Sequence, residues 1–425
     1  MIVSPPEPAF ATALPPWPAR DGLRITAVRA IVTAPGGTPL VVVRVDTNEP
    51  GLYGLGCATF TQRWRSVVTT VEEHVSRLVV GRHPGDIEDI SRAIQYGPYW
   101  RGGPISNNAL SGVDMALWDL LGKSLGVPVY ALLGGRVRAQ VPTYTHASGA
   151  TVEETLERAA EIITAGWQHV RLQSAQPGLG SYGYPGVGGG YPDAPNPDGW
   201  DVRQYLDATP RLFEQARDTL GDQVQLLHDA HSRLDPKEAI LLARRLEPYH
   251  LLYLEDVLAP EHFGRLDEVR TAAPIPIAAG ELCTSLTEAA RLVTTLSVDY
   301  LRCHISAIGG LSQARKLVAL AELHSIRTAW HSPPDVSPVG VAANVALDVT
   351  SPAFGILECY VYPQAVHDVF PGTLTPTRGH LAPHETPGWG IDLDEELAAR
   401  FPPTDSSHDR WALGVRSPDG ALLAP

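Results

Sequence analysis

Short apolar runs and longer amphipathic stretches alternate along the chain from residue 141 onward. Between the short runs, apolar residues recur at three- and four-residue spacing, which predicts helices. Eight such strand–helix units predict an α/β fold, a parallel (β/α)8 TIM-type barrel over residues 141–360. A doubly wound sheet is the alternative, but no glycine-rich phosphate turn follows the first strand. The strand-like runs are 141–147, 169–173, 224–230, 251–257, 275–281, 299–305, 327–332 and 354–360, and the clearest helical stretches are 151–166, 235–249 and 311–324.

The segments on either side of the predicted barrel have a different pattern. Residues 1–21 are rich in proline and alanine and lack a basic region, so we expect an extended tail rather than a signal peptide. Residues 22–140 mix strand-like stretches such as RITAVRAIVT with helical ones such as NNALSGVDMALWDLLGKSLG, which predicts an α+β module. Residues 361–425 are irregular and proline-rich, and we expect them to pack back on that module.

One connection between predicted barrel units is unusually long. Residues 174–200 are rich in glycine, proline and tyrosine. Loops beyond about 12–15 residues are usually functional or disordered. Because this one leaves the second strand at the mouth of the predicted barrel, we expect a lid-like loop. A surface excursion or a contact between subunits is the alternative.

Composition narrows the classes of partner. The 425 residues contain 33 Lys and Arg against 47 Asp and Glu, a net charge of −14, which argues against nucleic acid and anionic membranes as partners. No stretch approaches the ~18 consecutive apolar residues of a membrane-spanning helix. The four cysteines are scattered without a CxxC pair, which favours a reduced, cytoplasmic protein.

Three carboxylates follow consecutive predicted strands. Asp229, Glu255 and Glu281 are separated by equal intervals of 26 residues, about the length of one strand–helix unit. Equal intervals put them at the same level on adjacent strands, where they would repel one another without a cation. Oxygen-only ligation is typical of Mg²⁺, so the spacing predicts a magnesium site. Ordinary helix-capping carboxylates are the alternative, which would explain one such residue better than three in register.

Alternation along the strands places the residues beside the carboxylates either on the same face as the carboxylates or on the opposite face. His231 lies two residues beyond Asp229 and shares its face, so we expect it to reach the same pocket. Its imidazole titrates near neutral pH, which suits proton transfer. His228 and Asp256 point to the opposite face and are predicted to be structural.

Several motifs are similar to those of a known family. ALWDLLGKSLGVPVYALLGG (116–135) resembles the end of the capping domain of the enolase superfamily. HDAH, LED, GEL and FGILE resemble the acid-sugar dehydratase branch, D-mannonate dehydratase and its relatives. The resemblance covers about residues 22–420 and implies that residues 22–140 form a capping domain completed by residues 361–425. It also implies a homo-oligomer with one Mg²⁺ per subunit.

The resemblance assigns roles to individual residues. It implies that Asp229, Glu255 and Glu281 hold Mg²⁺ and that His231 is an acid or base. An Arg on the second strand and a Tyr in the following loop form the other acid/base pair. The residues at these positions here are Arg171 and Tyr182, with Tyr184 as the substitute because the loop spacing differs by one residue.

Other matching positions contact substrate in the family: His146, Arg302, His331, Asp335 and Glu358. Two positions depart from the family pattern. Thr61 stands where the family has an asparagine, and Ala412 stands where a larger apolar residue is expected. Both departures fall on substrate-selecting parts, so they affect the substrate rather than the chemistry.

The implied reaction is dehydration of an acid sugar. A base removes the C2 proton, an acid protonates the departing 3-hydroxyl, and the enol becomes a 2-keto-3-deoxy acid. We expect D-mannonate, D-gluconate or both as substrate. Residues 171–173 contain no lysine, which disfavours the lysine-based reactions of the superfamily. Three alternatives remain: another polyol acid as substrate, a racemase or epimerase that uses His331, and a non-catalytic acid-sugar-binding protein.

Overall fold

The computed structural model describes residues 22–176, 199–404 and 415–423. Most of the residue 174–200 loop, with Tyr182 and Tyr184, therefore lies outside the described residues, as do Ala412 and the N-terminal tail. Within the described ranges, no helix has the length and apolar character needed to cross a membrane.

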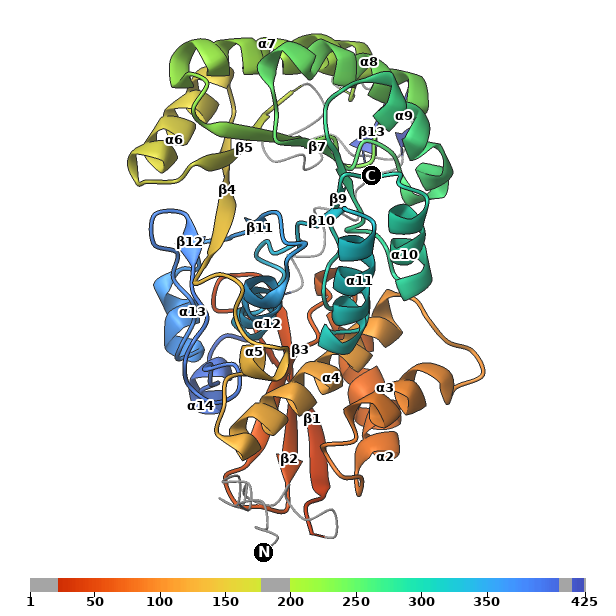
Figure 1. The fold of residues 1–425 in the computed structure, drawn as a ribbon, viewed down its shortest axis with the longest axis vertical. Coiled ribbons are helices and arrows are strands. Elements are labelled where there is room, and N and C mark those ends of the chain that lie inside the picture. Colours follow the sequence, from red (N-terminus) through yellow and green to blue (C-terminus); the bar gives the residue numbers. More distant parts are fainter. Residues whose placement is uncertain (1–21, 177–198, 405–414, 424–425) are drawn as a thin grey trace, which may run out of the picture.

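Parallel strands form a barrel in the half of the molecule distant from the N-terminal end (Figure 1). Neighbours along the chain pair with one another, and the last strand pairs in parallel with the first through Leu357 and Thr143. A bridge between Thr328 and Phe354 closes the remaining gap. The strands are β4 (Val141–Gly149), β5 (His169–Ser174), β6 (Gln225–Asp229), β7 (Tyr253–Glu255), β8 (Ile277–Ala279), β9 (Tyr300–Leu301), β10 (Arg327–Thr328) and β11 (Leu357–Glu358). The barrel predicted from the sequence pattern is confirmed.

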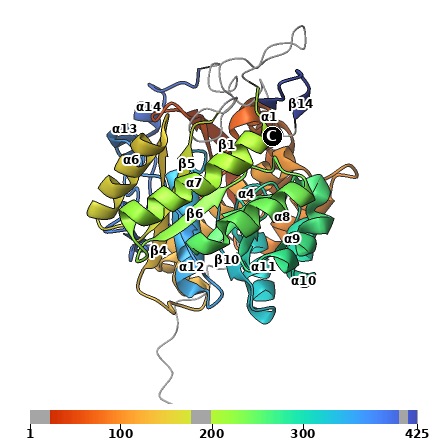
Figure 2. The same ribbon diagram turned by 90° about the horizontal axis from the view of Figure 1, so that it is seen from above.

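Helices surround the barrel strands, as Figure 2 shows from above. Each buries one apolar face, and several start at a side-chain cap. At the start of α8, for example, Asp235 and Glu238 form a reciprocal capping box. The barrel helices are α6 (Val152–Thr164), α7 (Val202–Leu220), α8 (Pro236–Leu246), α9 (Leu266–Ala272), α10 (Leu286–Thr294), α11 (Leu311–Leu323) and α12 (Pro338–Thr350), with 3₁₀ turns at Glu247–Tyr249 and Pro260–Arg265.

Six of the eight barrel strands are shorter than the apolar runs predict, whereas β4 and β5 are slightly longer. The run 299–305 supplies only the two residues of β9, and the run 251–257 supplies only three. A positive φ follows three of the strands, at His231 after β6, at Asp256 after β7 and at Gly280 after β8. A positive φ interrupts an extended chain, so the polar residues after each strand lie in turns at the barrel mouth.

An antiparallel sheet and a long helix form the N-terminal module. Strands β1, β2 and β3 pair in that order, and α4 lies across β3. A Cβ at Gly54 or Gly56 would lie 1.9 Å from a carbonyl oxygen of α4, so glycine permits this close contact. The elements are β1 (Ile25–Thr33), β2 (Leu40–Thr47), β3 (Tyr53–Cys57), a 3₁₀ turn (Thr61–Arg63), α1 (Trp64–Thr69), a π-helical turn (Thr70–Val75), α2 (Ser76–Val79), α3 (Ile87–Tyr96), α4 (Pro104–Leu125) and α5 (Val129–Leu132).

The C-terminal segment divides between this module and the barrel. Its α13 and α14 lie on the side of the module (Figure 1), where Glu395 accepts hydrogen bonds from Arg29 and Arg44, and Thr33 donates to the carbonyl of Ala398. Residues 415–423 lie beside the barrel, where the carbonyl of Arg416 accepts from the amide of Trp200. Its elements are α13 (Gln364–Val369), β12 (His380–Leu381), α14 (Glu395–Ala398), β13 (Val415–Arg416) and β14 (Leu422–Leu423).

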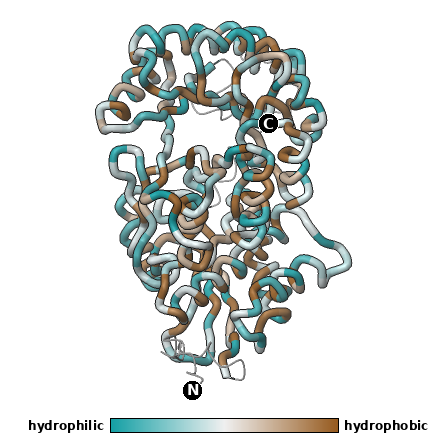
Figure 3. Tube along the Cα trace, in the orientation of Figure 1, coloured by the Kyte–Doolittle hydropathy of each residue, from teal (hydrophilic) through white to brown (hydrophobic). Residues whose placement is uncertain are grey.

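Hydrophobic residues concentrate where the module meets the barrel. Helices α4 and α12 are buried over most of their length, and Figure 3 shows apolar colour there, whereas α7 and α8 are largely hydrophilic outside. Polar contacts fix the junction: Asp114 on α4 accepts from the amide of Ser312 at the start of α11, and Trp118 donates to the Ser312 hydroxyl.

Asp119 on α4 joins three segments from one buried position. Its carboxylate accepts from the amide of Leu55 at 2.9 Å, the amide of Trp389 at 2.8 Å and Lys123 Nζ at 2.6 Å. Burial raises the pKa of Asp119, while Lys123 and the two amides oppose that shift. The side chain therefore ties α4 to β3 and to the C-terminal segment.

We predict that Asp119→Ala lowers the free energy of unfolding by about 3–5 kcal/mol, because it leaves buried donors without an acceptor. Urea denaturation would measure the loss. Asp89→Ala is the matched control, since Asp89 pairs with Arg82 at the surface with 78% of its side chain exposed. Its effect is expected to stay within about 0.5 kcal/mol. Equal losses in the two variants would contradict the role given to Asp119.

Candidate active site

The three predicted carboxylates converge at the mouth of the barrel. Asp229 and Glu255 are direct partners in the β6–β7 register, and Glu281 lies two residues beyond the end of β8. One carboxylate oxygen from each lies within 4.8 Å of the other two. Asp229 and Glu255 are buried, and Glu281 keeps 20% of its side chain exposed. The cluster therefore opens to the surface on the Glu281 side.

Arg171 lies against the buried half of the cluster. It projects from β5, and its Nη1 lies 3.0 Å from both Asp229 Oδ2 and Glu255 Oε1. Its side chain is only 3% exposed. A guanidinium is always charged in proteins, so Arg171 is a fixed positive charge beside two carboxylates.

Arg302 is completely buried and contacts the other side of the cluster. Its Nε lies 2.7 Å from Glu255 Oε1, and its Nη1 lies 3.2 Å from Glu281 Oε2. Its Nη2 pairs with Glu358, a carboxylate at the end of β11 that is also completely buried. Tyr144 OH accepts from Arg302 at 3.1 Å. Arg302 and Glu358 thus face each other and the cluster.

The cluster gathers four carboxylates, those of Asp229, Glu255, Glu281 and Glu358. Arg171 and Arg302 contact them directly, and Arg233 acts on Asp229 through its charge. Burial raises the pKa of Asp229 and of Glu255, so these carboxyls favour a proton or a cation beside them. Glu255 Oε2 is buried and has no hydrogen-bond partner among the described residues. An unpartnered carboxylate oxygen in an all-oxygen donor set fits a hard divalent cation such as Mg²⁺.

His231 reaches this cluster, as predicted, but by a different backbone route. Strand alternation does not continue to residue 231, because its φ is +49° and β6 ends at Asp229. The turn instead brings His231 Nε2 to 3.1 Å from Asp229 Oδ2. Gln173 Nε2 lies 3.0 Å from His231 Nδ1. Burial and the positive charges of Arg233 and Arg171 hold the pKa of His231 well below its usual value.

His228 and Asp256 have structural contacts. His228 Nε2 lies 2.8 Å from Tyr205 OH, and its Nδ1 lies 3.0 Å from the carbonyl of Leu172. Asp256 accepts from the amide of Gly280 at 3.4 Å. Burial and the neighbouring carboxylates raise the pKa of Asp256 well above its usual value. His228 thus links β6 to β5 and α7, and Asp256 supports the turn before Glu281.

His331 lies on the exposed side of the cluster. Its Nδ1 lies 3.1 Å from Glu281 Oε2 and 2.7 Å from Arg302 Nη1, and its Nε2 lies 3.5 Å from Asp335 Oδ1. Burial and Arg302 oppose a charge on this ring, but Glu281 and Asp335 outweigh them and raise the pKa of His331 to about 10. The positively charged, protonated form of His331 is thus favoured between the carboxylates of Glu281 and Asp335.

His146 joins the group from β4. Its Nε2 lies 2.7 Å from Glu358 Oε1. Burial and the charge of Arg171 lower the pKa of His146 to about 4. The structure therefore brings together ten of the residues selected from the sequence: Arg171, Asp229, His231, Glu255, Glu281, Arg302, His331, Asp335, Glu358 and His146.

Thr61 lies at the edge of the N-terminal module that faces the barrel loops. It begins the 3₁₀ turn four residues after Cys57, whose carbonyl accepts from Ser306 in the loop after β9. In the described part of the chain, no hydrogen bond or ion pair joins Thr61 to the cluster. Tyr182, Tyr184 and Ala412 lie outside the described residues.

His304 was not selected from the sequence. It lies beside His331, with ring centroids 5.1 Å apart, and is 8% exposed. A ring nitrogen of His304, one of His331 and an oxygen of Asp335 lie within 4.8 Å of one another. The sequence feature that could have identified His304 is its position two residues after Arg302, because alternate residues of a strand share a face.

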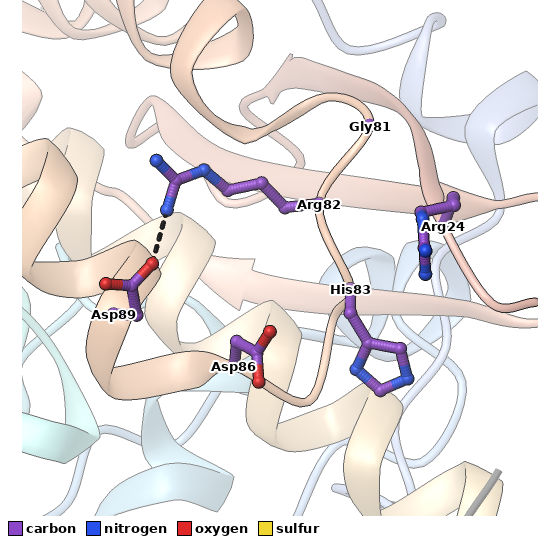
Figure 4. Close-up of a pocket in the computed structure, with 6 residues that line it drawn as sticks. All are labelled: Arg24, Gly81, Arg82, His83, Asp86 and Asp89. Atoms are coloured by element: carbon purple, nitrogen blue, oxygen red, sulfur yellow. Dashed lines mark hydrogen bonds and ion pairs between the residues drawn. The ribbon is translucent and has the colours of Figure 1, made fainter. Parts of the chain in front are cut away.

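A separate surface recess lies in the N-terminal module, between α2 and α3 (Figure 4). Its lining includes Arg24, Arg82, His83, Asp86 and Asp89. Arg82 points along the recess to Asp89, 2.7 Å away. Positive and negative groups are balanced there, and none of the residues selected from the sequence lines it.

Two family models match the chain. Residues 19–134 match the N-terminal domain of the mandelate racemase / muconate lactonizing enzymes, and residues 154–397 match the enolase C-terminal domain-like family. The interval between these matches, residues 135–153, contains β4.

Curated relatives show to which branch of the enolase superfamily the chain belongs. A "D-galactonate dehydratase family member" of Catenulispora acidiphila is 61% identical over 420 residues, covering 99% of this chain and 98% of the relative. The chain belongs to the D-galactonate dehydratase family. This membership confirms the resemblance to the acid-sugar dehydratases, which are hydro-lyases of the enolase superfamily. Another D-galactonate dehydratase family member, from Pantoea ananatis, is 44% identical and covers 95% of this chain and 100% of its own.

Solved structures agree with this D-galactonate dehydratase family assignment. An enolase from Pantoea ananatis with bound D-gluconate and Mg superposes with a TM-score of 0.90 at 44% identity, covering 95% of this chain and 100% of that one. A mandelate racemase/muconate lactonizing enzyme from Labrenzia alexandrii gives 0.79 at 27% identity, with 90% and 96% covered.

We predict that Mg²⁺ raises the thermal unfolding midpoint of the wild-type protein relative to EDTA, because a cation relieves repulsion between the carboxylates. At a free ion concentration a hundredfold above the dissociation constant, the gain is about 2.7 kcal/mol. Asp229→Asn is expected to lose most of this response. Glu268→Gln, which alters a surface pair with Arg265, is expected to keep it. Identical midpoints in Mg²⁺ and EDTA for the wild type would exclude the site.

Proposed function

We propose that this protein is a Mg²⁺-dependent acid-sugar dehydratase that converts a hexonate, D-mannonate or D-gluconate or both, to a 2-keto-3-deoxy acid. The observation that carries the proposal is the cluster of Asp229, Glu255 and Glu281 with His231 at its edge. Family membership and the gluconate and Mg of the Pantoea ananatis structure support it.

Asp229, Glu255 and Glu281 would hold the ion. When bound, Mg²⁺ supplies positive charge that stabilises the negative charge developing on the substrate carboxylate as the C2 proton leaves. Arg171 and Arg302 hold the three carboxylates in place from the buried side. The substrate therefore approaches from the Glu281 side, the exposed part of the cluster.

Tyr182 is the proposed base, with Tyr184 as the alternative. A tyrosine has a reference pKa near ~10, and the fixed charge of Arg171 would stabilise its phenolate. The electron pair of the C2–H bond first moves into the substrate carboxylate, which gives an enolate, and then forms the C2–C3 double bond as the C3–O bond breaks. The resulting enol then takes up a proton at C3 and becomes the keto acid.

His231 is the proposed acid. It would protonate the 3-hydroxyl, which then leaves as water. An anionic substrate beside the ring stabilises the imidazolium form that this step needs. His331, Asp335, Glu358, His146, Arg302, Thr61 and Ala412 are proposed to bind the rest of the substrate or to position the groups that do.

We predict that the purified protein with Mg²⁺ forms a 2-keto-3-deoxy acid from D-mannonate or D-gluconate. His231→Asn is expected to lower that rate by about 10²–10⁴-fold, because the departing hydroxyl loses its proton donor. Exchange of the C2 proton with D₂O, followed by NMR, is expected to survive in His231→Asn. The control is His250→Asn, an exposed position in the turn before β7, at the opposite end of that strand from Glu255.

Each result has a distinct meaning. Undiminished dehydration in His231→Asn would refute its role as the acid. A Mg²⁺-stabilised protein with no product from either hexonate would direct the search to another polyol acid. Inversion at C2 without loss of water would instead favour the racemase that uses His331.

Tyrosine variants test the base separately. We predict that Tyr182→Phe abolishes both C2 exchange and dehydration, because no group then accepts the C2 proton, whereas Tyr184→Phe retains both. Mg²⁺-induced stabilisation should persist in both variants, which shows that the fold and the cation site are intact. The opposite pattern would assign the base to Tyr184, and activity in both single variants would refute a tyrosine base.

A further inference from the structure

His304 lies at the barrel mouth beside His331, on the side of the cluster away from His231. Residues 304 and 331 form a parallel bridge beyond β9 and β10, which aligns their side chains. The ring planes are inclined by 31°, with centroids 5.1 Å apart. At 8% exposure, His304 is held in one orientation by its surroundings.

The backbone fixes which nitrogen of His304 carries a hydrogen. The amide of Ser306 donates to His304 Nδ1 at 3.1 Å. A neutral imidazole has one donor and one acceptor nitrogen, so Nε2 is the donor. Burial lowers the pKa of His304 to about 4, which keeps the ring neutral near pH 7.

The hydrogen on His304 Nε2 decides between two functions for the group formed by His304, His331 and Asp335: a metal site, or a hydrogen-bonding site for a ligand. Two imidazoles and a carboxylate within 4.8 Å resemble a transition-metal donor set. Ligation through His304 Nε2 would need a lone pair there and the hydrogen on Nδ1, pointing at the Ser306 amide. The existing hydrogen bond therefore favours a donor at Nε2 over a metal ligand.

Asp335 supplies an acceptor close to the His304 ring. Its Oδ1 is 3.5 Å from His331 Nε2, too long for a strong hydrogen bond, so the oxygen keeps acceptor capacity. A hydroxyl group both donates and accepts, and it matches a donor and an acceptor side by side. A carboxylate would be repelled by Asp335. The chemistry of this group therefore suits the polyol chain of an acid sugar.

We propose that His304 is a specificity-determining residue that donates its Nε2–H to a hydroxyl of the substrate's polyol chain, with Asp335 as the neighbouring acceptor. This inference rests on the proposed function, because it presumes a polyhydroxy acid in the site. It adds a recognition element on the β9–β10 side that is separate from the cation and the proton-transfer groups.

Calorimetric binding at saturating Mg²⁺ tests the proposal in proteins that all carry His231→Asn, in which dehydration of the hexonates is expected to be slowed by about 10²–10⁴-fold. The probes are D-gluconate, D-mannonate and glycolate, a 2-hydroxy acid without a polyol chain. His304→Leu is expected to weaken binding of the bound hexonate by about tenfold to a hundredfold and to leave glycolate and Mg²⁺ binding unchanged. His304→Gln, which retains an N–H donor, is expected to restore part of the loss. His74→Leu, an exposed position in the N-terminal module, is the control.

The outcomes separate this proposal from the proposed function. Unchanged hexonate binding in His304→Leu, or an equal loss for hexonate, glycolate and Mg²⁺, would overturn the role of His304 alone. A second equivalent of bound Zn²⁺ in the wild type that disappears in His304→Leu would overturn the donor assignment. A wild-type protein that binds Mg²⁺ but neither hexonate would overturn both proposals.

Discussion

The site depends on one constraint: several negatively charged carboxylates must be held close together at one end of the barrel. Asp229 and Glu255 are buried side by side on adjacent strands, where they destabilise the fold unless positive charge lies between them. Arg171 supplies that charge from the preceding strand, and Arg302 supplies it from a later one. Because a closed barrel fixes the register of all these strands, the protein can hold the carboxylates close together and still leave Glu255 Oε2 available to a cation. The arginines lower the repulsion without occupying the exposed side.

In the proposed function, the fold places the cation and part of the substrate selection on different elements. The groups proposed for the cation, and His231 as the proposed acid, come from barrel strands and the turns directly after them. The N-terminal module approaches the mouth through the end of β3, where the Cys57 carbonyl accepts from Ser306 and the chain continues to Thr61. Asp119 holds that module together with the C-terminal segment. Substitutions in the module can therefore change which acid sugar fits while the carboxylate cluster stays intact.

The sequence predicts the barrel and its carboxylates well because both depend on repetition. Equal intervals between Asp229, Glu255 and Glu281 translate into equal levels on adjacent strands, and hydrophobic periodicity identifies the units that carry them. The sequence predicts the ends of strands poorly, because left-handed turns such as that at His231 do not change the pattern of hydrophobic residues. His231 reached the predicted pocket through such a turn rather than by alternation. His304 was missed because its role depends on Ser306 and Asp335, whose proximity arises only in the folded chain.

Two groups of titratable residues adjoin at the barrel mouth, and hydrogen positions give them different chemistry. The carboxylate cluster offers only oxygen acceptors, so it selects a hard cation and is indifferent to the configuration of a sugar chain. The group of His304, His331 and Asp335 presents donors beside an acceptor, so it responds to where hydroxyls lie. Acid sugars share the carboxylate and the 2-hydroxyl, and many differ in the configuration of the carbons beyond C2, whereas D-mannonate and D-gluconate differ at C2 alone. Discrimination among acid sugars that differ beyond C2 must therefore come from groups of the second kind, and an intact cation site alone does not determine the substrate.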